Sequence, residues 1–129
     1  MSARILLIED DAIAQIVFVQ QLQQCGCWVD LAKTGEEAIE KFITGDHDFI
    51  LMDIRLSGTS GFEVTRCIRA TEKGRTIPII GITAYPLFYV EEESVAAGMN
   101  EVISKPCSKE TVMKLMASYA SEFRFSRVK

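Results

Sequence analysis

Short runs of consecutive apolar residues recur along the chain, and each run ends abruptly at a polar or charged side chain. The clearest, Phe49 to Met52, ends at Asp53. A segment that is apolar at every position is typical of a strand buried on both faces, as in a parallel sheet. The pattern predicts this strand and four more, at residues 4–8, 27–31, 78–82 and 101–104.

The segments between these strands carry apolar residues at the spacing of an amphipathic helix. Asp11 and Ser108 are good N-cap residues for two of these helices, and Gly26 is suited to end the first. Helices are expected at residues 12–25, 34–44, 62–70 and 86–98, and from residue 108 onward. The residues expected to face inward are Val64, Cys67 and Ile68 in the third helix, Val95 and Ala96 in the fourth, and Val112, Leu115, Met116 and Tyr119 in the last.

The alternation of strands and helices predicts an α/β fold with a doubly wound, five-stranded parallel sheet and five helices. Right-handed crossovers favour the strand order 2-1-3-4-5. In such sheets ligands bind outside the carboxyl ends of the strands, here where the order reverses between the first and third strands. Glu9, Asp10 and Asp53 would meet there, and Thr83 and Lys105 would follow the last two strands at the same edge.

These side chains suggest a phosphoryl-acceptor chemistry. Crowded carboxylates raise one another's pKa unless a cation neutralises them, and Mg²⁺ prefers such oxygen ligands. A carboxylate such as Asp53 can attack phosphorus and form an aspartyl phosphate. The Lys105 ammonium and the Thr83 hydroxyl could stabilise the charge that develops on the phosphoryl oxygens.

Composition excludes several other classes of protein. A length of 129 residues fits one domain, expected at residues 1–122, followed by a basic tail at residues 123–129. A net charge of −4 and a pI near 5.0 argue against nonspecific binding to nucleic acid or to anionic membranes. No apolar run is long enough to span a bilayer, and residues 1–4 show no signal-peptide pattern. Four scattered cysteines are best explained as reduced thiols of a cytoplasmic protein.

The sequence resembles the receiver domain of two-component response regulators, the flavodoxin-like family of the chemotaxis regulator CheY. The resemblance covers residue 4 to about residue 120. It rests on the motifs Ile5-Leu6-Leu7-Ile8-Glu9-Asp10-Asp11, Ile50-Leu51-Met52-Asp53, Gly61-Phe62-Glu63, Ile82-Thr83-Ala84, Ala97-Gly98-Met99 and Lys105-Pro106.

The resemblance implies a role for each residue at the predicted edge. Asp53 is the phosphoacceptor, Thr83 is the switch hydroxyl, and Lys105 pairs with the phosphoryl group. The Mg²⁺ ligands would be Asp53, Asp10 directly, Glu9 through water, and the backbone carbonyl of Arg55; Mn²⁺ is expected to substitute. The peptide before Pro106 is often cis in this family, and Arg55 and Tyr85 are expected to shield the site from water.

The implied partner is a histidine kinase or a histidine phosphotransfer protein in a two-component system or phosphorelay. We expect it to dock on Ile13, Ile16 and Val17 and on the loop at Pro106, because the first helix has more apolar residues than one buried stripe needs. The chain would be no conventional enzyme, although it would catalyse its own phosphorylation and dephosphorylation. It could stand alone or be a module of a hybrid sensor histidine kinase.

Two departures from the family pattern are visible. Ser57 and Ser60 replace the proline and aspartate that are common in the loop after Asp53, which raises the question of how this loop is kept rigid. Val102 occupies the position, three residues before the lysine, where the family usually has Tyr or Phe. The usual aromatic switch would therefore be absent or relocated, which suits a relay of phosphoryl groups better than a large conformational output.

Three alternative functions fit the sequence less well. A Mg²⁺-dependent aspartate-nucleophile phosphatase of the haloacid dehalogenase type needs a second acid where this chain has Arg55. A flavin-binding module needs a phosphate loop after the first strand, where Glu9 to Asp11 would repel a phosphate. A partner-binding pseudo-receiver would not need Asp53, Thr83 and Lys105. His47, the only histidine, is expected in a surface loop at the other end of the sheet, and Asp11 is expected to cap a helix rather than bind metal.

Overall fold

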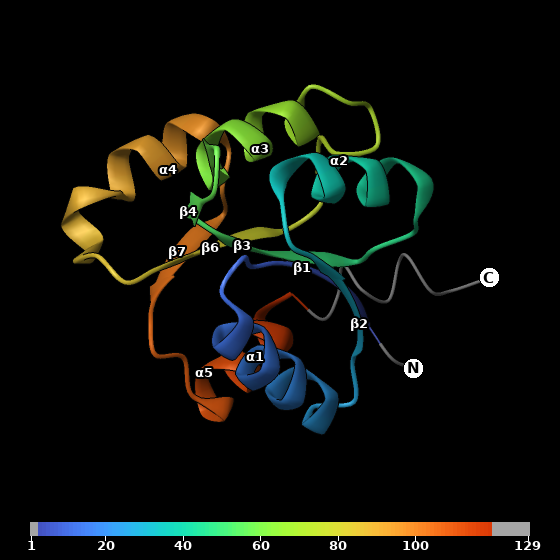
Figure 1. Ribbon diagram of the computed structural model, residues 1–129, viewed down its shortest axis with the longest axis vertical. Helices are drawn as coiled ribbons and strands as arrows, with labels where there is room; N and C mark the ends of the chain where they lie inside the picture. Colours follow the sequence, from blue (N-terminus) through green and yellow to red (C-terminus); the bar gives the residue numbers. More distant parts are fainter. Residues whose placement is uncertain (1–2, 120–129) are drawn as a thin grey trace.

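Strands that are apolar on both faces need a helical layer on each side of the sheet. The computed structural model describes residues 3–119 and has this arrangement (Figure 1). The five-stranded parallel sheet has the order β2-β1-β3-β6-β7. Its strands are β1 (Arg4–Ile8), β2 (Trp28–Ala32), β3 (Phe49–Asp53), β6 (Ile79–Thr83) and β7 (Glu101–Ser104). The strand order predicted from the sequence is therefore confirmed.

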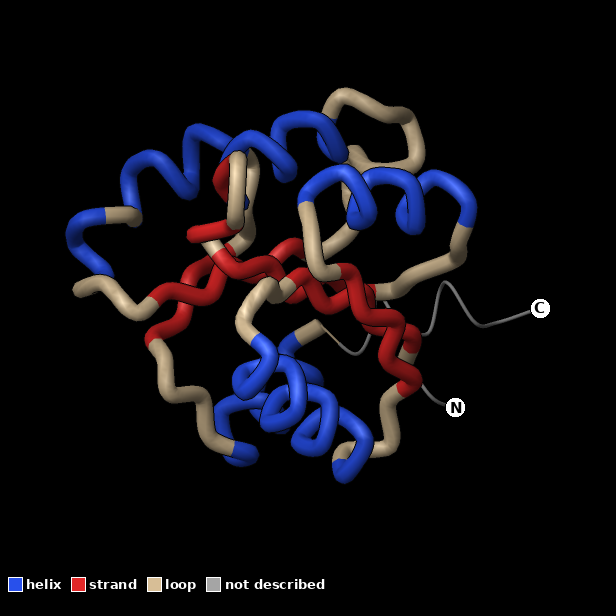
Figure 2. The backbone as a smooth tube through the Cα atoms, in the orientation of Figure 1, coloured by secondary structure: helices blue, strands red, loops and turns tan. Residues whose placement is uncertain are grey.

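Two helices cover one face of the sheet and three cover the other (Figures 1 and 2). The first pair is α1 (Ala12–Gln24) and α5 (Lys109–Ser118); the other three are α2 (Gly35–Thr44), α3 (Gly61–Arg69) and α4 (Glu91–Ala97). Side chains alternate between the two layers along each strand. In β3, Phe49 and Leu51 pack in the core under α1 and α5, while Ile50 and Met52 pack in the core under the other three helices.

Side-chain N-caps begin four of the five described α-helices, all except α4. Asp11, Thr34, Ser60 and Ser108 each accept a hydrogen bond from the backbone amide three residues later. Asp11 and Ser108 are thus the N-caps that the sequence indicated, and Asp11 has this structural role beside the site. The main chain turns sharply after α1 at Gly26, whose φ of 83° is readily adopted only by glycine.

Two expectations about the segment after β3 were wrong in detail. Residues 56–61 are not a plain loop, because β4 (Arg55–Leu56) and β5 (Thr59–Ser60) form a small antiparallel hairpin. Cys67 is exposed, since the buried stripe of α3 is completed by Phe62 and Thr65 beside Val64 and Ile68.

The fourth helix also differs. Pro86 precedes a short 3₁₀ turn (Leu87–Tyr89), and α4 begins only at Glu91. The buried positions are therefore Ser94 and Ala97, and the predicted inward residues Val95 and Ala96 are exposed. Burial of the polar Ser94 costs little because its hydroxyl donates to Val90 O at 2.6 Å.

Within residues 3–119, no helix has both the length and the apolar character that crossing a bilayer requires. The predicted domain end at residue 122 and the basic tail at residues 123–129 lie outside the described residues.

Candidate functional site

The register of the parallel strands brings the predicted site residues to one level. Ile8 lies beside Met52, so Glu9 and Asp53, one residue further along, end neighbouring strands together. Thr83 lies beside Ser104, and Lys105 follows directly. The resulting crevice has a volume of about 490 Å³. It is lined by Glu9, Asp10, Asp11, Asp53, Arg55, Leu56, Ser57, Thr83, Ala84 and Lys105.

Three carboxylates form the acidic part of this crevice. Glu9, Asp10 and Asp53 each present an oxygen, and these oxygens lie within 4.8 Å of one another. Burial raises the pKa of Glu9 to about 7, and the neighbouring Asp53 carboxylate adds to the rise, while Lys105 opposes it. An all-oxygen set at this spacing, two of its members buried, fits a hard divalent cation such as Mg²⁺.

Lys105 is the cation that the chain itself supplies to this cluster. Its Nζ donates a hydrogen bond to Asp53 Oδ2 at 3.0 Å. It also lies 3.0 Å from Glu9 Oε1, as an ion pair without the alignment of a hydrogen bond. Burial alone would lower the pKa of Lys105, but the contacts with Glu9 and Asp53 outweigh it and raise that pKa. The peptide between Lys105 and Pro106 is cis, as the family resemblance implied.

Asp53 is held at the mouth of the sheet by backbone as well as by Lys105. The Arg55 amide donates to Asp53 Oδ1 at 3.1 Å. Helix α3 begins close behind, because Gly61 has no Cβ: one placed there would lie 2.4 Å from the Asp53 carbonyl oxygen. On the other side the buried Thr83 hydroxyl accepts from the Tyr85 amide at 2.9 Å. The fold therefore fixes Asp53 and Thr83 at adjacent strand ends.

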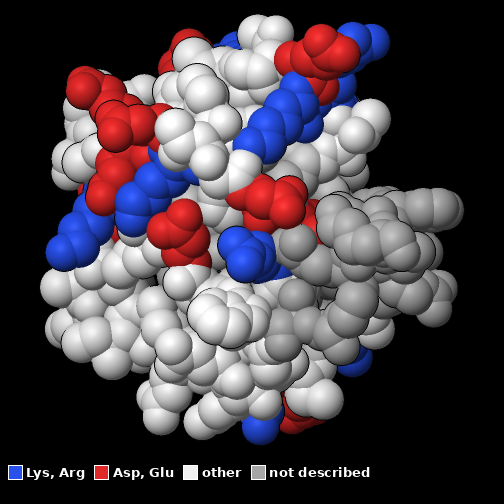
Figure 3. All heavy atoms as spheres, turned by 90° about the vertical axis from the view of Figure 1, so that its right-hand side faces the viewer, with Lys and Arg blue, Asp and Glu red and all other residues white. Residues whose placement is uncertain are grey.

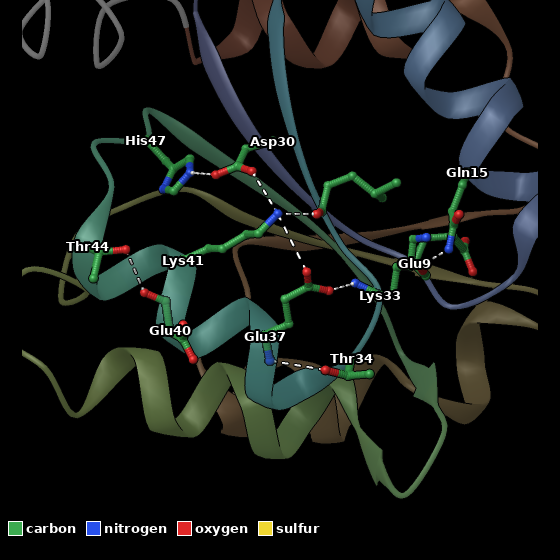
Figure 4. Close-up of polar contacts among 11 residues, drawn as sticks. Glu9, Gln15, Asp30, Lys33, Thr34, Glu37, Glu40, Lys41, Thr44 and His47 are labelled. Carbon is green, nitrogen blue, oxygen red and sulfur yellow. Dashed lines mark hydrogen bonds and ion pairs between the residues drawn. The ribbon is translucent and has the colours of Figure 1, made fainter.

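Asp10 is held by a residue whose role the sequence did not reveal. Ser57 donates to Asp10 Oδ2 twice, from its backbone amide at 2.9 Å and from its hydroxyl at 2.8 Å. Gln15 makes a second unpredicted contact, because its side-chain amide donates to Glu9 O at 2.8 Å (Figure 4). Both contacts fix the chain that leaves β1.

A side-chain contact joins Arg55, in β4 at the rim of the crevice, to Tyr85 in the segment after β6. Arg55 Nη1 donates to Tyr85 Oη at 2.6 Å, and the guanidinium lies 5.4 Å from the centre of the tyrosine ring. The expectation that these two residues shield the site from water stays a prediction. The further expectation, that the Arg55 carbonyl binds metal, stays a prediction.

His47 lies in the loop before β3, away from the crevice, but its ring is not on the surface. The side chain is only 4% exposed, and Nε2 lies 3.0 Å from Asp30 Oδ2 (Figure 4). Lys41 also binds Asp30, at 3.2 Å. Burial would raise the pKa of Asp30, but hydrogen bonds from His47 and Lys41 lower it. The histidine thus belongs to a polar network that joins α2 to the edge strand β2.

An uncharged surface lies next to the crevice. Helix α1 contains no charged residue, and its side chains Ile13, Ile16 and Val17 are exposed. In Figure 3 the lower part of the described surface, on the α1 side of the sheet, carries far fewer charged side chains than the upper part. Gln21 ties α1 to the loop after Lys105, because its amide donates to Cys107 O at 2.7 Å. The helix and this loop therefore form one continuous surface.

Comparisons with known proteins agree with this geometry. A family model described as the response regulator receiver domain matches residues 5–117. The polar-differentiation response regulator DivK of Brucella ovis is 30% identical over 122 residues, covering 95% of this chain and 99% of that protein. The receiver domain of sensor histidine kinase PA1611 from Pseudomonas aeruginosa PAO1 has a TM-score of 0.87 and 35% identity, covering 94% of this chain and 99% of that one. That structure holds a magnesium ion coordinated in its active-site cleft.

Longer relatives contain a similar segment as a small part of their length. The sensor histidine kinase RcsC of Escherichia coli (strain K12) is 28% identical over 95% of this chain, but the matched region is 13% of that kinase. Similarity of this kind therefore extends both to regulators of about this length and to segments of much larger kinases.

Proposed function

This chain belongs to the response regulator receiver family of two-component and phosphorelay systems, and we propose that it accepts a phosphoryl group on Asp53 from a phosphohistidine. The observation that carries the proposal is the Asp53 carboxylate itself. It stands at the open end of β3 in contact with Lys105 and within 4.8 Å of two further acids. A phosphatase of the haloacid dehalogenase type would need a second acid where this chain has Arg55, and a flavin site would need a phosphate loop where it has Glu9 to Asp11.

The proposed transfer balances without any further reactant except water. An Asp53 oxygen attacks phosphorus, the P–N bond of the donor breaks, and its electron pair stays on the imidazole nitrogen, which takes up a proton from water. The product is an acyl phosphate. Lys105 contacts the attacking Asp53 carboxylate, so its ammonium is placed to neutralise charge on the phosphoryl oxygens. The Thr83 hydroxyl ends the neighbouring strand and can donate to the same group.

The donor set of the crevice suits Mg²⁺. Glu9, Asp10, Asp53 and the backbone carbonyl of Arg55 would hold it, and Mn²⁺, which also accepts oxygen ligands, would substitute. Bound there, the ion would supply positive charge to the phosphoryl oxygens, of the kind that Lys105 supplies alone in its absence. The magnesium ion in the cleft of the similar PA1611 receiver supports this assignment.

The chain would act as a signalling module rather than as a conventional enzyme, since the residue that reacts is its own. Self-catalysed phosphorylation and hydrolysis follow from the same crevice, because water can attack the acyl phosphate that Asp53 forms. We place the module in the cytoplasm. The regulators and kinases that it resembles support both a stand-alone regulator and a module of a hybrid kinase.

A histidine kinase or phosphotransfer protein would dock on α1 and the neighbouring Pro106–Cys107 loop. A phosphohistidine must reach Asp53 from the crevice mouth, and this surface is the uncharged one beside it. Exposed Ile13 and Ile16 would form the apolar centre of the interface. The hydrogen bond from Gln21 to Cys107 O supports treating helix and loop as one docking surface.

The test is phosphorylation by a small phosphodonor. With acetyl phosphate and MgCl₂, intact-mass spectrometry should detect one added phosphoryl group, which EDTA suppresses and hydroxylamine removes. Asp53→Asn keeps the size of the side chain but removes the nucleophile, so no mass should be added. Phosphorylation of Asp53→Asn at the wild-type rate would contradict the proposal.

A further inference from the structure

The three acidic side chains of the crevice are held in different ways. Glu9 is held by the Asp11 amide, which donates to Oε2 at 3.2 Å, and by Lys105. Asp53 is held by the Arg55 amide and by Lys105. Asp10 is the most exposed of the three, and among the described residues its hydrogen bonds come from Ser57.

Ser57 reaches Asp10 because of the turn in which it lies. Leu56 pairs with Thr59 across the hairpin, so Ser57 and Gly58 are the two central residues of the turn. Gly58 has a φ of 77° and Ser57 does not have a positive φ, which is the pattern of a type II turn. Proline is favoured at the first central position of this turn type, but proline has no amide hydrogen to donate.

Ser57 lacks the conformational advantage of proline in this turn, but it supplies two hydrogen-bond donors, its backbone amide and its hydroxyl. Both donors are neutral, so they orient Asp10 without bringing a second cation that would compete with a metal ion. They also occupy Oδ2, which leaves Oδ1 for other partners. Because solvent reaches both residues, the two bonds add little to the free energy of unfolding. Their consequence is the position of the carboxylate.

We infer that Ser57 is a positioning residue of the cation site, which holds Asp10 ready to bind a divalent ion and links the β4–β5 hairpin to that ion. The inference rests on the proposed function, because it assigns a role toward the Mg²⁺ of that site. It also answers how the loop after Asp53 is ordered without the proline common in the family. Ser57 anchors the loop to Asp10, and Ser60 caps α3.

The test is a titration of each variant with MgCl₂ alone, followed by amide chemical shifts, with no phosphodonor present. Ser57→Pro fits the turn and follows an extended residue, so it should keep or raise the melting temperature. It removes both donors, so the Mg²⁺ dissociation constant should rise by about tenfold or more, as for other residues that orient a metal ligand. Ser57→Ala should fall between Ser57→Pro and wild type, and Ser57→Thr should restore most of the affinity.

Ser60→Ala is the matched control, since it removes a serine of the same loop that caps α3 and does not contact Asp10. It should lower the melting temperature and leave Mg²⁺ affinity unchanged. If wild type, Ser57→Ala and Ser57→Pro bind Mg²⁺ with equal affinity, the inference is wrong but the proposed function stands. The same holds if Ser60→Ala loses as much Mg²⁺ affinity as the Ser57 variants do. A wild-type chain with no saturable Mg²⁺ binding would overturn the proposed function, and the inference with it. If Ser57→Pro does not fold, Ser57→Ala against Ser57→Thr decides.

Discussion

Asp53 is buried, but a phosphodonor can reach its carboxylate through the crevice. Its carboxylate is almost fully buried, yet it ends a strand and lines an open crevice. Lys105 and the Arg55 amide orient its two oxygens. The lifetime of a phosphoryl group on Asp53 depends on how readily water reaches it. Arg55 lines the crevice and is hydrogen-bonded to Tyr85, so this pair is placed to limit the access of water.

We predict that Tyr85 prolongs the life of phosphorylated Asp53. Tyr85→Ala removes both the ring and the acceptor of the Arg55 hydrogen bond, so hydrolysis should accelerate severalfold. Tyr85→Phe keeps the ring over which the guanidinium lies and should have a smaller effect. The measurement is the decay of the phosphorylated mass after the donor is removed.

Phe88→Ala serves as the control, because Phe88 is an exposed aromatic residue that takes no part in the contact between Arg55 and Tyr85. It should decay at the wild-type rate. Decay of Tyr85→Ala at that same rate would show that the contact between Arg55 and Tyr85 does not exclude water.

Single residues differ in how far the sequence could identify them. Asp53, Glu9 and Lys105 were predictable, because each stands at the carboxyl end of a strand-like run and these ends meet in a parallel sheet. The contact of Ser57 with Asp10 was not, since it joins positions 47 residues apart through a turn that has no periodic signal. His47 was expected at the surface, but its ring is buried because Asp30 and Phe42 lie against it.

At the scale of elements, α1 is unusual in having no charged residue over thirteen positions. Phe18 and Leu22 anchor it to the sheet, and Ala14 and Val19 pack partly against the same core. Ile13, Ile16 and Val17 are exposed and are left to face a partner. Ile13 is 74% exposed on α1, and Val95 is equally exposed on α4, on the other face of the sheet. These two residues offer a matched pair for testing where the donor docks.

Ile13→Glu should slow phosphoryl transfer from a phosphorylated histidine phosphotransfer protein by about tenfold, because a charge replaces an apolar residue at the centre of the interface. The rate with acetyl phosphate should stay unchanged, since the crevice is intact. Rapid quenching followed by gel separation measures both rates.

Val95→Glu adds the same charge on α4 and should leave both rates unchanged. If both variants slow transfer from the phosphotransfer protein equally, the donor does not dock specifically on α1. If Ile13→Glu also slows phosphorylation by acetyl phosphate, the substitution affects folding or chemistry and not docking.

The elements themselves were largely predictable, because strand runs and N-caps are local signals. The start of α4 was not. Pro86 can open a helix, but here a 3₁₀ turn intervenes and changes which residues face the sheet. The β4–β5 hairpin was missed because two-residue strands are too short to show an alternating pattern.

At the scale of the whole molecule, the question is how a change at Asp53 would reach a distant surface. Val102 pairs with Gly81 in the sheet and packs, half-buried, against the core under α2, α3 and α4. It lacks the ring and hydroxyl of the aromatic residue usual at this position, so it offers little to link Thr83 to the α4 face. A small conformational output is therefore expected, which suits a phosphoryl relay.

We predict that a beryllofluoride mimic of the phosphoryl group shifts amide resonances mainly in the loops around Asp53, Thr83 and Lys105. Since a switch needs two states of different free energy, a weakly coupled α4 face should change little. Asp53→Asn controls for effects of the reagent alone. Large shifts across residues 88–119, or dimerisation on activation, would contradict the relay.

The most direct test of the whole account is to locate the phosphoryl group chemically. Borohydride reduction converts an aspartyl phosphate to homoserine, which peptide sequencing by mass spectrometry can assign to one position. After incubation with acetyl phosphate and MgCl₂, we predict homoserine at position 53 and no reduction at the other carboxylates of the crevice. Reduction at position 9 or 10, or an acid-labile phosphate on His47 with position 53 unchanged, would contradict it.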